Sequence, residues 1–253
     1  MDQLEFRKRI KGGESLLGCA VGLSHPMAVE IAGYAGFDFV FLDTEHSALG
    51  ITEVESMILA ARVGKIAAIY RVRQLDSAEI GRALDIGANG ILVPHIRTVE
   101  EARLVVEASR YSPIGRRGMG PGRQIKFGLT DAKDYVAHAN ENTVVALMIE
   151  DREAVENIEA IAAVDGIDVF NIGTCDLSNS LGIPFQTRHP NVVEAIERII
   201  DAAKANNIAV GVPPESAEEV LELKKMGCSF FECCSVQDVL AHGLREFICR
   251  ANS

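Results

Sequence analysis

An eightfold alternation of short apolar runs and helical segments is the feature that most constrains how this chain can fold. Each run is rich in β-branched or aromatic residues and is apolar on both faces, which is typical of strands in a parallel sheet that is buried on both sides. The eight candidate strands span residues 16–24, 37–43, 67–73, 90–96, 144–150, 167–173, 208–213 and 229–234.

Segments of helical period lie between these runs, and several open with Ser, Thr, Asp or Asn and close on Gly or Asn. Eight strand–helix units in a row predict an α/β protein whose parallel sheet closes into a TIM (β/α)8 barrel. No change of composition marks a linker, and 253 residues of which 48% are hydrophobic can build one large core, so we expect a single domain over residues 1–253. The candidate helices span residues 25–36, 51–64, 76–87, 98–110, 152–164, 191–207 and 216–227.

Charge and cysteine content narrow the classes of partner and compartment. A net charge of −11 without a basic patch disfavours nucleic acid and membrane surfaces as partners. No run approaches the ~20 apolar residues of a membrane span, and residues 1–15 lack the apolar region of a signal peptide. The six cysteines show no C-x-x-C spacing and lie in apolar runs, which predicts buried free thiols in a reducing compartment. We therefore expect a cytoplasmic enzyme or binding protein.

Two connections, 111–134 and 174–189, are longer than the others and carry no strong helical or strand pattern. Long irregular segments in a compact domain are usually functional or lie at interfaces. Three interpretations stay open for the connection 111–134: a solvated loop, a subunit contact or a clamp for an anionic substrate. Its basic residues are Arg116, Arg117, Arg123 and Lys126.

Polar side chains end or follow several of the predicted strands. The stretch "FVFLDTEHS" begins as a buried strand and ends in three ionisable groups, of which Asp43 is the first. Because active sites of (β/α)8 barrels lie at the carboxyl ends of the strands, groups far apart in sequence converge there. Each has an ordinary explanation by itself, as an ion pair or a hydrogen-bonded histidine. Their combination favours one site formed by Glu45, His46, Arg71, Glu150 and Asp176.

The chemistry of these groups suggests separate roles. Glu150 and Asp176 are oxygen ligands suited to Mg²⁺ or Mn²⁺, which keep open positions for a bidentate 2-oxo acid. Such an ion would polarise the keto oxygen and stabilise an enolate. Arg71 would add positive charge where the enolate oxygen develops, and His46 could move the proton.

Other mechanisms agree less well with the sequence. A Schiff-base aldolase needs a desolvated lysine, and Lys65, the lysine beside the third strand, lies at the wrong end of it. Phosphate-binding barrels have glycine-rich turns after the seventh and eighth strands, which this chain lacks. His25 and His95 also end strands and could form a zinc site with His46, but each equally suits pocket lining or a turn cap. Vicinal cysteines at 233 and 234 are interpreted as pocket wall.

Several motifs together resemble the HpcH/HpaI family of metal-dependent class II aldolases, which cleave 4-hydroxy-2-oxo acids to pyruvate and an aldehyde. The resemblance extends over nearly the whole chain. Its most specific parts are the D-x-E-H element and the later D-L-S. The motifs are "GFDFVFLDTEHS", "YRV", "ALDIGANGILVPHIRTVEEA", "RYSPIGRRG", "MIED" and "NIGTCDLSNSLG".

The resemblance implies a role for each matching residue. His46 would be the base and Arg71 the group that stabilises the transition state, while Glu150 and Asp176 would hold Mg²⁺ or Mn²⁺, with Co²⁺ as a further candidate. It also implies that Asp85 raises the basicity of the histidine. The helix pattern puts Asp85 near the opposite rim, from which it would reach His46 only in a neighbouring subunit. Asp43, three residues before His46, is the alternative orienting acid.

Two departures from the family pattern concern the substrate. Met148 stands two positions before the ligand glutamate, where relatives commonly have glutamine, so a donor to bound keto acid is missing. Thr174 and Cys175 replace Pro-Ala before the ligand aspartate. In the family, main-chain N–H groups hold the pyruvate carboxylate here, and Gly173 to Cys175 would supply them, so this second change is the more tolerable.

Two competing functions stay open, one of them enzymatic. A related lyase acting on acyl-CoA thioesters such as malyl- or citryl-CoA would need a cationic groove, and a barrel without catalysis could bind keto acids. The family commonly forms hexamers by exchanging a C-terminal helix, and residues 235–253 match such a helix. A homo-oligomer, and a hexamer in particular, is therefore implied by the resemblance, although the helix could also pack on its own barrel.

Overall fold

A computed structural model describes residues 3–120 and 122–252. Their strands form one closed barrel in which every neighbouring pair is parallel, as the alternation of elements predicts. β1 pairs with β2 on one side and with β8 on the other, and this second pairing closes the sheet. The strands are β1 (Leu16–Val21), β2 (Phe39–Asp43), β3 (Ala67–Arg71), β4 (Gly90–Val93), β5 (Val144–Ile149), β6 (Val169–Ile172), β7 (Ala209–Gly211) and β8 (Phe230–Ser235).

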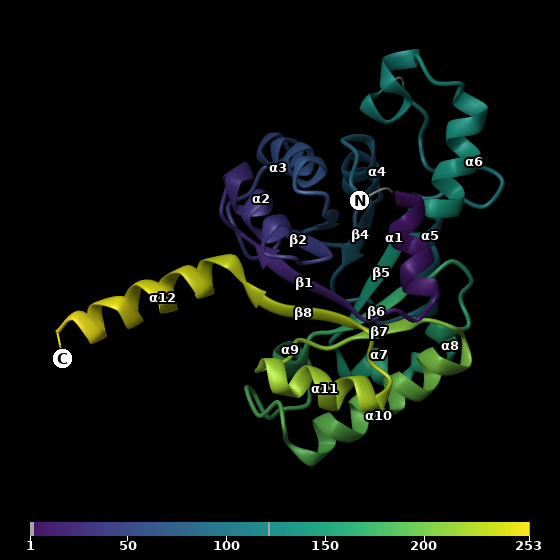
Figure 1. The fold of residues 1–253 in the computed structure, drawn as a ribbon. Helices are drawn as coiled ribbons and strands as arrows, with labels where there is room; N and C mark the ends of the chain where they lie inside the picture. The colour runs from purple at the N-terminus through teal and green to yellow at the C-terminus, as the bar shows by residue number, and fades with distance from the viewer. Residues whose placement is uncertain (1–2, 121, 253) are drawn as a thin grey trace.

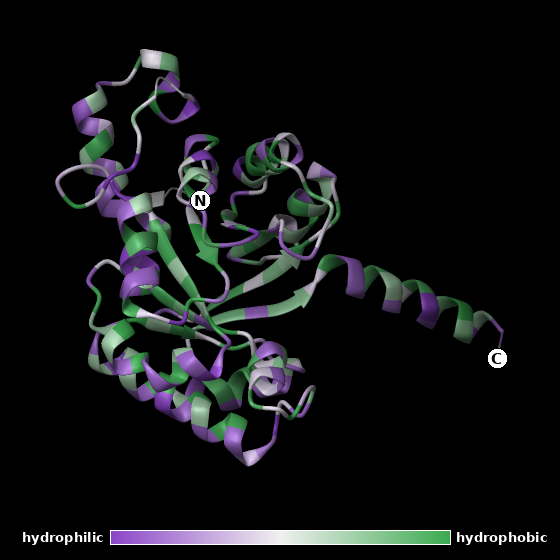
Figure 2. Cartoon of the chain, turned by 180° about the vertical axis from the view of Figure 1, so that it is seen from behind, coloured by the Kyte–Doolittle hydropathy of each residue, from purple (hydrophilic) through white to green (hydrophobic). Residues whose placement is uncertain are grey.

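Helices surround the barrel, and one more extends away from it (Figure 1). In Figure 2 the strands are mostly hydrophobic, whereas the helices alternate between hydrophobic and hydrophilic residues. The helices are α1 (Gln3–Lys11), α2 (Pro26–Tyr34), α3 (Ile51–Val63), α4 (Ser77–Asp85), α5 (Val99–Ser109), the 3₁₀ helix η1 (Arg123–Gly128), α6 (Ala132–Asn142), α7 (Arg152–Glu156), α8 (Ile158–Ala162), α9 (Thr174–Ser180), α10 (Pro190–Ala205), α11 (Ala217–Met226) and α12 (Val236–Ala251).

The barrel has two apolar cores, because successive side chains of each strand point to opposite faces of the sheet. One lies between the sheet and the helices, and the other fills the barrel. In the inner core Phe39 stacks on Phe230 with 4.1 Å between ring centroids, and Phe6 of α1 packs against both rings. α1 therefore closes the amino-terminal end of the barrel, and the other end remains for polar groups.

A buried carboxylate holds α1 in this position. Asp168 has no exposed side-chain surface, and it forms ion pairs with Arg7 at 2.9 Å and Lys11 at 3.1 Å, both from α1. Arg110 approaches it at 3.6 Å, and the main-chain N–H of Val145 donates to it. Burial, opposed by Asp168, lowers the pKa of Arg110 to about 10. The charge of Asp168 is thus shared by three cations.

The structure corrects several expectations about the elements. The predicted helix 152–164 is two helices, because Asn157 (φ −99°, ψ 5°) leaves the helical conformation and its side chain donates to the Arg97 carbonyl. The segments 111–134 and 174–189 are not wholly irregular, since η1 lies in the first and α9 opens the second. α6 is not among the predicted helices, and it begins at the N-cap Asp131, whose side chain accepts the main-chain N–H groups of Lys133 and Asp134.

The thiols are less buried than predicted. All six cysteines are free, but only Cys19 and Cys228 are buried, while Cys175 and Cys249 are exposed. An apolar run buries a side chain only where another element covers it, and nothing in the described chain covers these two positions. In residues 3–120 and 122–252, no helix has the length and apolarity that crossing a bilayer would require.

Candidate active site

The carboxyl ends of the strands bring most of the predicted site residues to one rim. Asp43 is the last residue of β2, Arg71 is the last residue of β3, and Glu150 directly follows β5. Asp176 lies in the first turn of α9, after β6. The strands are parallel in a closed barrel, so these ends share one mouth.

Asp43 shapes the turn that carries the predicted base. Its Oδ1 accepts the main-chain N–H groups of Glu45 at 3.1 Å and His46 at 3.2 Å. The His46 imidazole is 62% exposed, and its Nε2 lies 3.7 Å from Glu45 Oε2. Asp43 thus orients His46 through the main chain, and the carboxylate that the structure places beside the imidazole is Glu45.

Arg71 points into a ring of carboxylates. Its Nη2 lies 2.5 Å from Glu45 Oε2, and its Nε lies 3.8 Å from Asp43 Oδ1. Burial by itself would lower the pKa of Arg71, but Asp43, Glu45 and further carboxylates outweigh burial and raise the pKa. Arg71 therefore stays cationic, and its buried Nε has no hydrogen-bond acceptor among the described residues.

Glu150 is the most buried acid of the rim, with 1% of its surface exposed. Its Oε1 accepts the main-chain N–H of His95 at 2.9 Å, whereas its buried Oε2 has no hydrogen-bond partner in the described part of the chain. Burial raises the pKa of Glu150, His95 and Arg71 oppose the rise, and Asp176 adds to it. The two predicted ligands are thus close enough to repel each other.

These groups suit a hard divalent cation. The buried Oε2 of Glu150 has no partner among the described residues and feels the charge of the exposed Asp176, so a cation would compensate it, and oxygen donors are what Mg²⁺ and Mn²⁺ prefer. Glu150 and Asp176 would hold such an ion. Across the described residues no group of three or more His, Cys, Asp or Glu side chains is arranged to bind a metal, so the remaining ligands would come from substrate and water.

A nitrogen-rich zinc site has less support. The ring of His25 caps α2 by accepting the main-chain N–H of Met27. His95 Nδ1 lies 3.2 Å from Asp151 Oδ2 and 3.3 Å from Glu150 Oε1. Each of these two imidazole rings therefore has a structural partner, which agrees with the interpretation of both histidines as turn caps or pocket lining.

The predicted substrate-binding residues border Glu150. Gly173 is the N-cap of α9, and a Cβ there would lie 2.4 Å from Glu150 Oε2, so only glycine permits this approach. Thr174 and Cys175 follow in the first turn of α9. Met148 is buried in the inner core, and its Cε would lie 3.1 Å from the same Cβ. An apolar side chain thus lies where the family resemblance implies an amide.

Asp85 lies away from this mouth. It ends α4, which runs from β3 to β4, so it lies at the amino-terminal ends of the strands. Its carboxylate accepts from Arg117 at 2.7 Å and from Gln124 at 3.2 Å. Within one chain Asp85 therefore partners the 111–134 segment, and the link to His46 that the resemblance implies would need a second subunit.

Sequence reasoning missed three polar groups near the mouth. Glu232 of β8 and Asn171 of β6 lie inside strands that were interpreted as apolar. Asp151 pairs with Arg97 at 3.0 Å on the rim beside His95. In the sequence, Glu232 is the single charged residue of "SFFECC". A buried apolar strand does not normally contain a charge, so this residue could have been recognised as a candidate.

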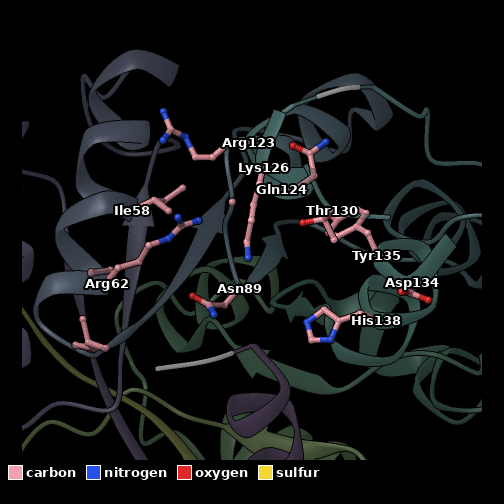
Figure 3. Close-up of a pocket in the computed structure, with 13 residues that line it drawn as sticks. Ile58, Arg62, Asn89, Arg123, Gln124, Lys126, Thr130, Asp134, Tyr135 and His138 are labelled. Atoms are coloured by element: carbon pink, nitrogen blue, oxygen red, sulfur yellow. The ribbon is translucent and has the colours of Figure 1, made fainter. Parts of the chain in front are cut away.

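A cavity of about 640 Å³ lies on the opposite side of the barrel, between α3, η1 and α6 (Figure 3). Asn89, which precedes β4, marks its floor at the amino-terminal ends of the strands. Lys126 and Arg62 point into it in the close-up. This cavity is therefore separate from the acidic mouth, which lies at the carboxyl ends of the strands.

Comparisons with known proteins agree with this geometry. Over 209 residues the chain is 38% identical to a hydroxypyruvate/pyruvate aldolase of Roseobacter denitrificans, covering 80% of this chain and 81% of the relative. It is 37% identical to a 2-keto-3-deoxy-L-rhamnonate aldolase of Klebsiella pneumoniae, covering 85% and 82%. The structure of the citrate synthase SbnG superimposes with a TM-score of 0.90 at 32% identity, covering 97% and 96%. Residues 16–230 match the family model described as HpcH/HpaI aldolase/citrate lyase, and the chain belongs to this family.

Proposed function

We propose that the protein is a metal-dependent class II aldolase that cleaves a 4-hydroxy-2-oxo acid to pyruvate and an aldehyde. Family membership supports an enzyme of the aldolase/lyase class. The observation that supports the metal dependence is Glu150, a buried carboxylate with one oxygen unpartnered among the described residues, on which the charge of Asp176 also acts.

The residues of the mouth would divide the reaction between them. His46 accepts the proton of the 4-hydroxyl group, the bond between carbons 3 and 4 breaks, and the aldehyde leaves while the electron pair stays on pyruvate as its enolate. Arg71 stabilises the negative enolate oxygen. Return of the proton from His46 to carbon 3 completes pyruvate. Glu150 and Asp176 would hold a divalent ion, which would supply Lewis-acid polarisation of the keto oxygen.

The test removes the metal and restores Mg²⁺, Mn²⁺, Co²⁺ or Zn²⁺ one at a time. Pyruvate release from a set of 4-hydroxy-2-oxo acids should return with Mg²⁺ or Mn²⁺. His46→Ala and Glu150→Ala should each lower turnover by at least about 10³-fold without loss of fold. Glu197→Ala, an exposed acid on α10, is the matched control and should behave as wild type. A variant at either site with unchanged turnover removes that residue from the mechanism.

A second candidate is a lyase acting on an acyl-CoA thioester, and the similarity to a citrate synthase favours it. The cations Arg62, Arg123 and Lys126 line the cavity of Figure 3 at the opposite end of the barrel, so they do not form a nucleotide groove beside the acidic mouth. Saturable binding of CoA would support this candidate. If heat-melting scans show binding of pyruvate or oxalate with Mn²⁺, but no aldehyde of a broad panel is turned over, a keto-acid-binding barrel becomes the better description.

We also propose that α12 packs against another subunit. The helix extends from the barrel (Figure 1), and every described residue from 238 to 252 is exposed. Its apolar side chains recur at helical spacing, so they form one stripe, which does not pack on its own barrel. A stripe of this size supports a homo-oligomer. Its members are Val239, Leu240, Leu244, Phe247 and Ile248, between 51% and 72% exposed.

A further inference from the structure

The main chain at His95 has a conformation that is uncommon for a residue with a side chain. His95 follows β4 and has a φ of 54°, in the left-handed region that favours glycine. Lys65 and Asn207 have the same φ, but each directly follows the C-cap of a helix, where a left-handed residue is ordinary. His95 follows a strand instead. Backbone strain of this kind, at the mouth of the barrel, points to a function.

The left-handed turn directs the main-chain N–H of His95 at Glu150. This N–H donates to Glu150 Oε1 at 2.9 Å, and Oε2 remains as the oxygen without a partner among the described residues. Oε2 faces the loop after β6, because a Cβ at Gly173 would lie 2.4 Å from it. Gly173 is the N-cap of α9, which carries Asp176 in its first turn. The hydrogen bond from His95 therefore fixes which oxygen of Glu150 faces the segment with the second predicted ligand.

Side-chain contacts hold His95 in this conformation. Its Nδ1 lies 3.2 Å from Asp151 Oδ2 and 3.3 Å from Glu150 Oε1. Asp151 is itself paired with Arg97 at 3.0 Å, and the residues on either side of His95 are buried. A strained residue persists where its surroundings over-determine its conformation. These contacts explain how a residue other than glycine can occupy the turn.

We propose that His95 is a positioning residue for Glu150 and acts through its left-handed main chain. Its N–H holds Oε1, so that Oε2 keeps the orientation that a divalent cation shared with Asp176 needs. This inference rests on the proposed function, in which Glu150 and Asp176 hold that cation. A residue that disfavours the left-handed conformation turns the N–H away, and both oxygens of Glu150 then lack a donor from the main chain of residue 95.

Two substitutions separate the main chain from the imidazole. His95→Gly and His95→Val both remove the ring, but only glycine adopts the left-handed conformation readily. Mn²⁺ is titrated into the full chain, and the free ion is measured by electron paramagnetic resonance. His95→Gly should bind Mn²⁺ nearly as tightly as wild type, and His95→Val should bind it at least about 10-fold more weakly than His95→Gly. Equal affinities of the two variants, whether both match wild type or both are weaker, overturn the proposal.

Lys65→Val is the matched control. Lys65 has the same φ of 54°, is exposed, and precedes β3 at the amino-terminal side of the barrel. It should lower Tm by a few degrees, as His95→Val does, but leave Mn²⁺ affinity unchanged. An equal loss of Mn²⁺ affinity in both valine variants overturns the proposal, since general destabilisation would then explain it. If His95→Val does not fold, His95→Ala takes its place, and an affinity equal to that of His95→Gly overturns the proposal.

Hydrogen exchange of the residue 95 amide distinguishes failure of this inference from failure of the proposed function. In metal-free protein the amide should exchange slowly in wild type and His95→Gly. It should exchange at least about 10-fold faster in His95→Val and in Glu150→Ala, which lacks the acceptor. Equal rates in all four proteins overturn the positioning role. If these rates differ as expected but wild type does not bind Mn²⁺ or release pyruvate, the metal-dependent aldolase proposal fails, whereas the positioning of Glu150 by His95 is retained.

Discussion

Gly173→Ala tests whether the close approach of the main chain to Glu150 serves the site. Alanine tolerates the backbone of Gly173 (φ −80°, ψ 86°), so the substitution adds a methyl group without left-handed strain. That methyl carbon would lie 2.4 Å from Glu150 Oε2, 2.9 Å from Glu150 Cβ and 3.1 Å from Met148 Cε. The perturbation is thus almost purely steric and is directed at one carboxylate.

The magnitude follows from these distances. Ordinary contact begins near 3.4 Å, so the carboxylate or the main chain must move by roughly 1 Å. Overpacking of this kind costs about 1–3 kcal/mol of stability. A misplacement of about 1 Å at a reacting centre costs on the order of 10²-fold in rate. We therefore expect turnover to fall about 100-fold, and Mn²⁺ affinity to fall at least about 10-fold.

The assay combines Mn²⁺ titration, followed by electron paramagnetic resonance of the free ion, with pyruvate release at saturating Mn²⁺. Gly81→Ala in α4 is the matched control, because a Cβ there would meet nothing within 4 Å. It should keep wild-type affinity and turnover. A folded Gly173→Ala protein that binds Mn²⁺ as tightly as Gly81→Ala would refute the reasoning that ties this glycine to a ligand carboxylate.

Three further predictions concern other parts of the molecule. Asp168→Asn should lower the free energy of unfolding in urea by about 3–5 kcal/mol, because it leaves Arg110 buried without its counter-charge. Iodoacetamide should inactivate the enzyme by alkylating the exposed thiol of Cys175, which tandem mass spectrometry locates, whereas burial raises the pKa of Cys19 to about 12 and protects it. Phe247→Glu on α12 should lower the molar mass in analytical ultracentrifugation by placing a charge in the apolar stripe.

Each of these predictions has a control within the chain. Asp165→Asn changes an exposed acid close in sequence to Asp168, and a similar loss of stability in both variants would contradict the buried-charge argument. Cys249→Ser should not slow inactivation, whereas Cys175→Ser should slow it at least about 10-fold. Arg245→Glu replaces an exposed polar residue of α12, so an equal mass for both α12 variants would rule out packing through the stripe.

Local pattern was sufficient for the strands but not for every helix. Each predicted strand is present, because a buried parallel strand needs only a short run of apolar residues, which is visible in the sequence. The predicted helix 152–164 is divided by a hydrogen bond from Asn157 to the Arg97 carbonyl, 60 residues away. The spacing of apolar residues within 152–164 carries no information about that contact.

For the candidate site, too, local pattern predicts where residues lie on the rim but not which side chains pair. Arg71 and Glu150 could be assigned to one rim from the sequence, since the ends of parallel strands must share a side of the barrel. The partners of these groups could not be assigned. Glu45 rather than Asp43 faces the His46 imidazole, and Asp85 is paired with Arg117. Such pairings depend on side-chain distances that strand order does not fix.

The sequence by itself therefore determined the barrel, its acidic mouth and the family, because the period of apolar residues and the order of motifs are properties of the chain read locally. Only the tertiary structure decided which groups lose water and which meet each other. It directed Glu232 into the interior, left one oxygen of Glu150 without a partner among the described residues, and set the apolar stripe of α12 apart from its own barrel. The physical reason is that desolvation and ion pairing act between residues far apart along the chain, which become neighbours only when the barrel closes.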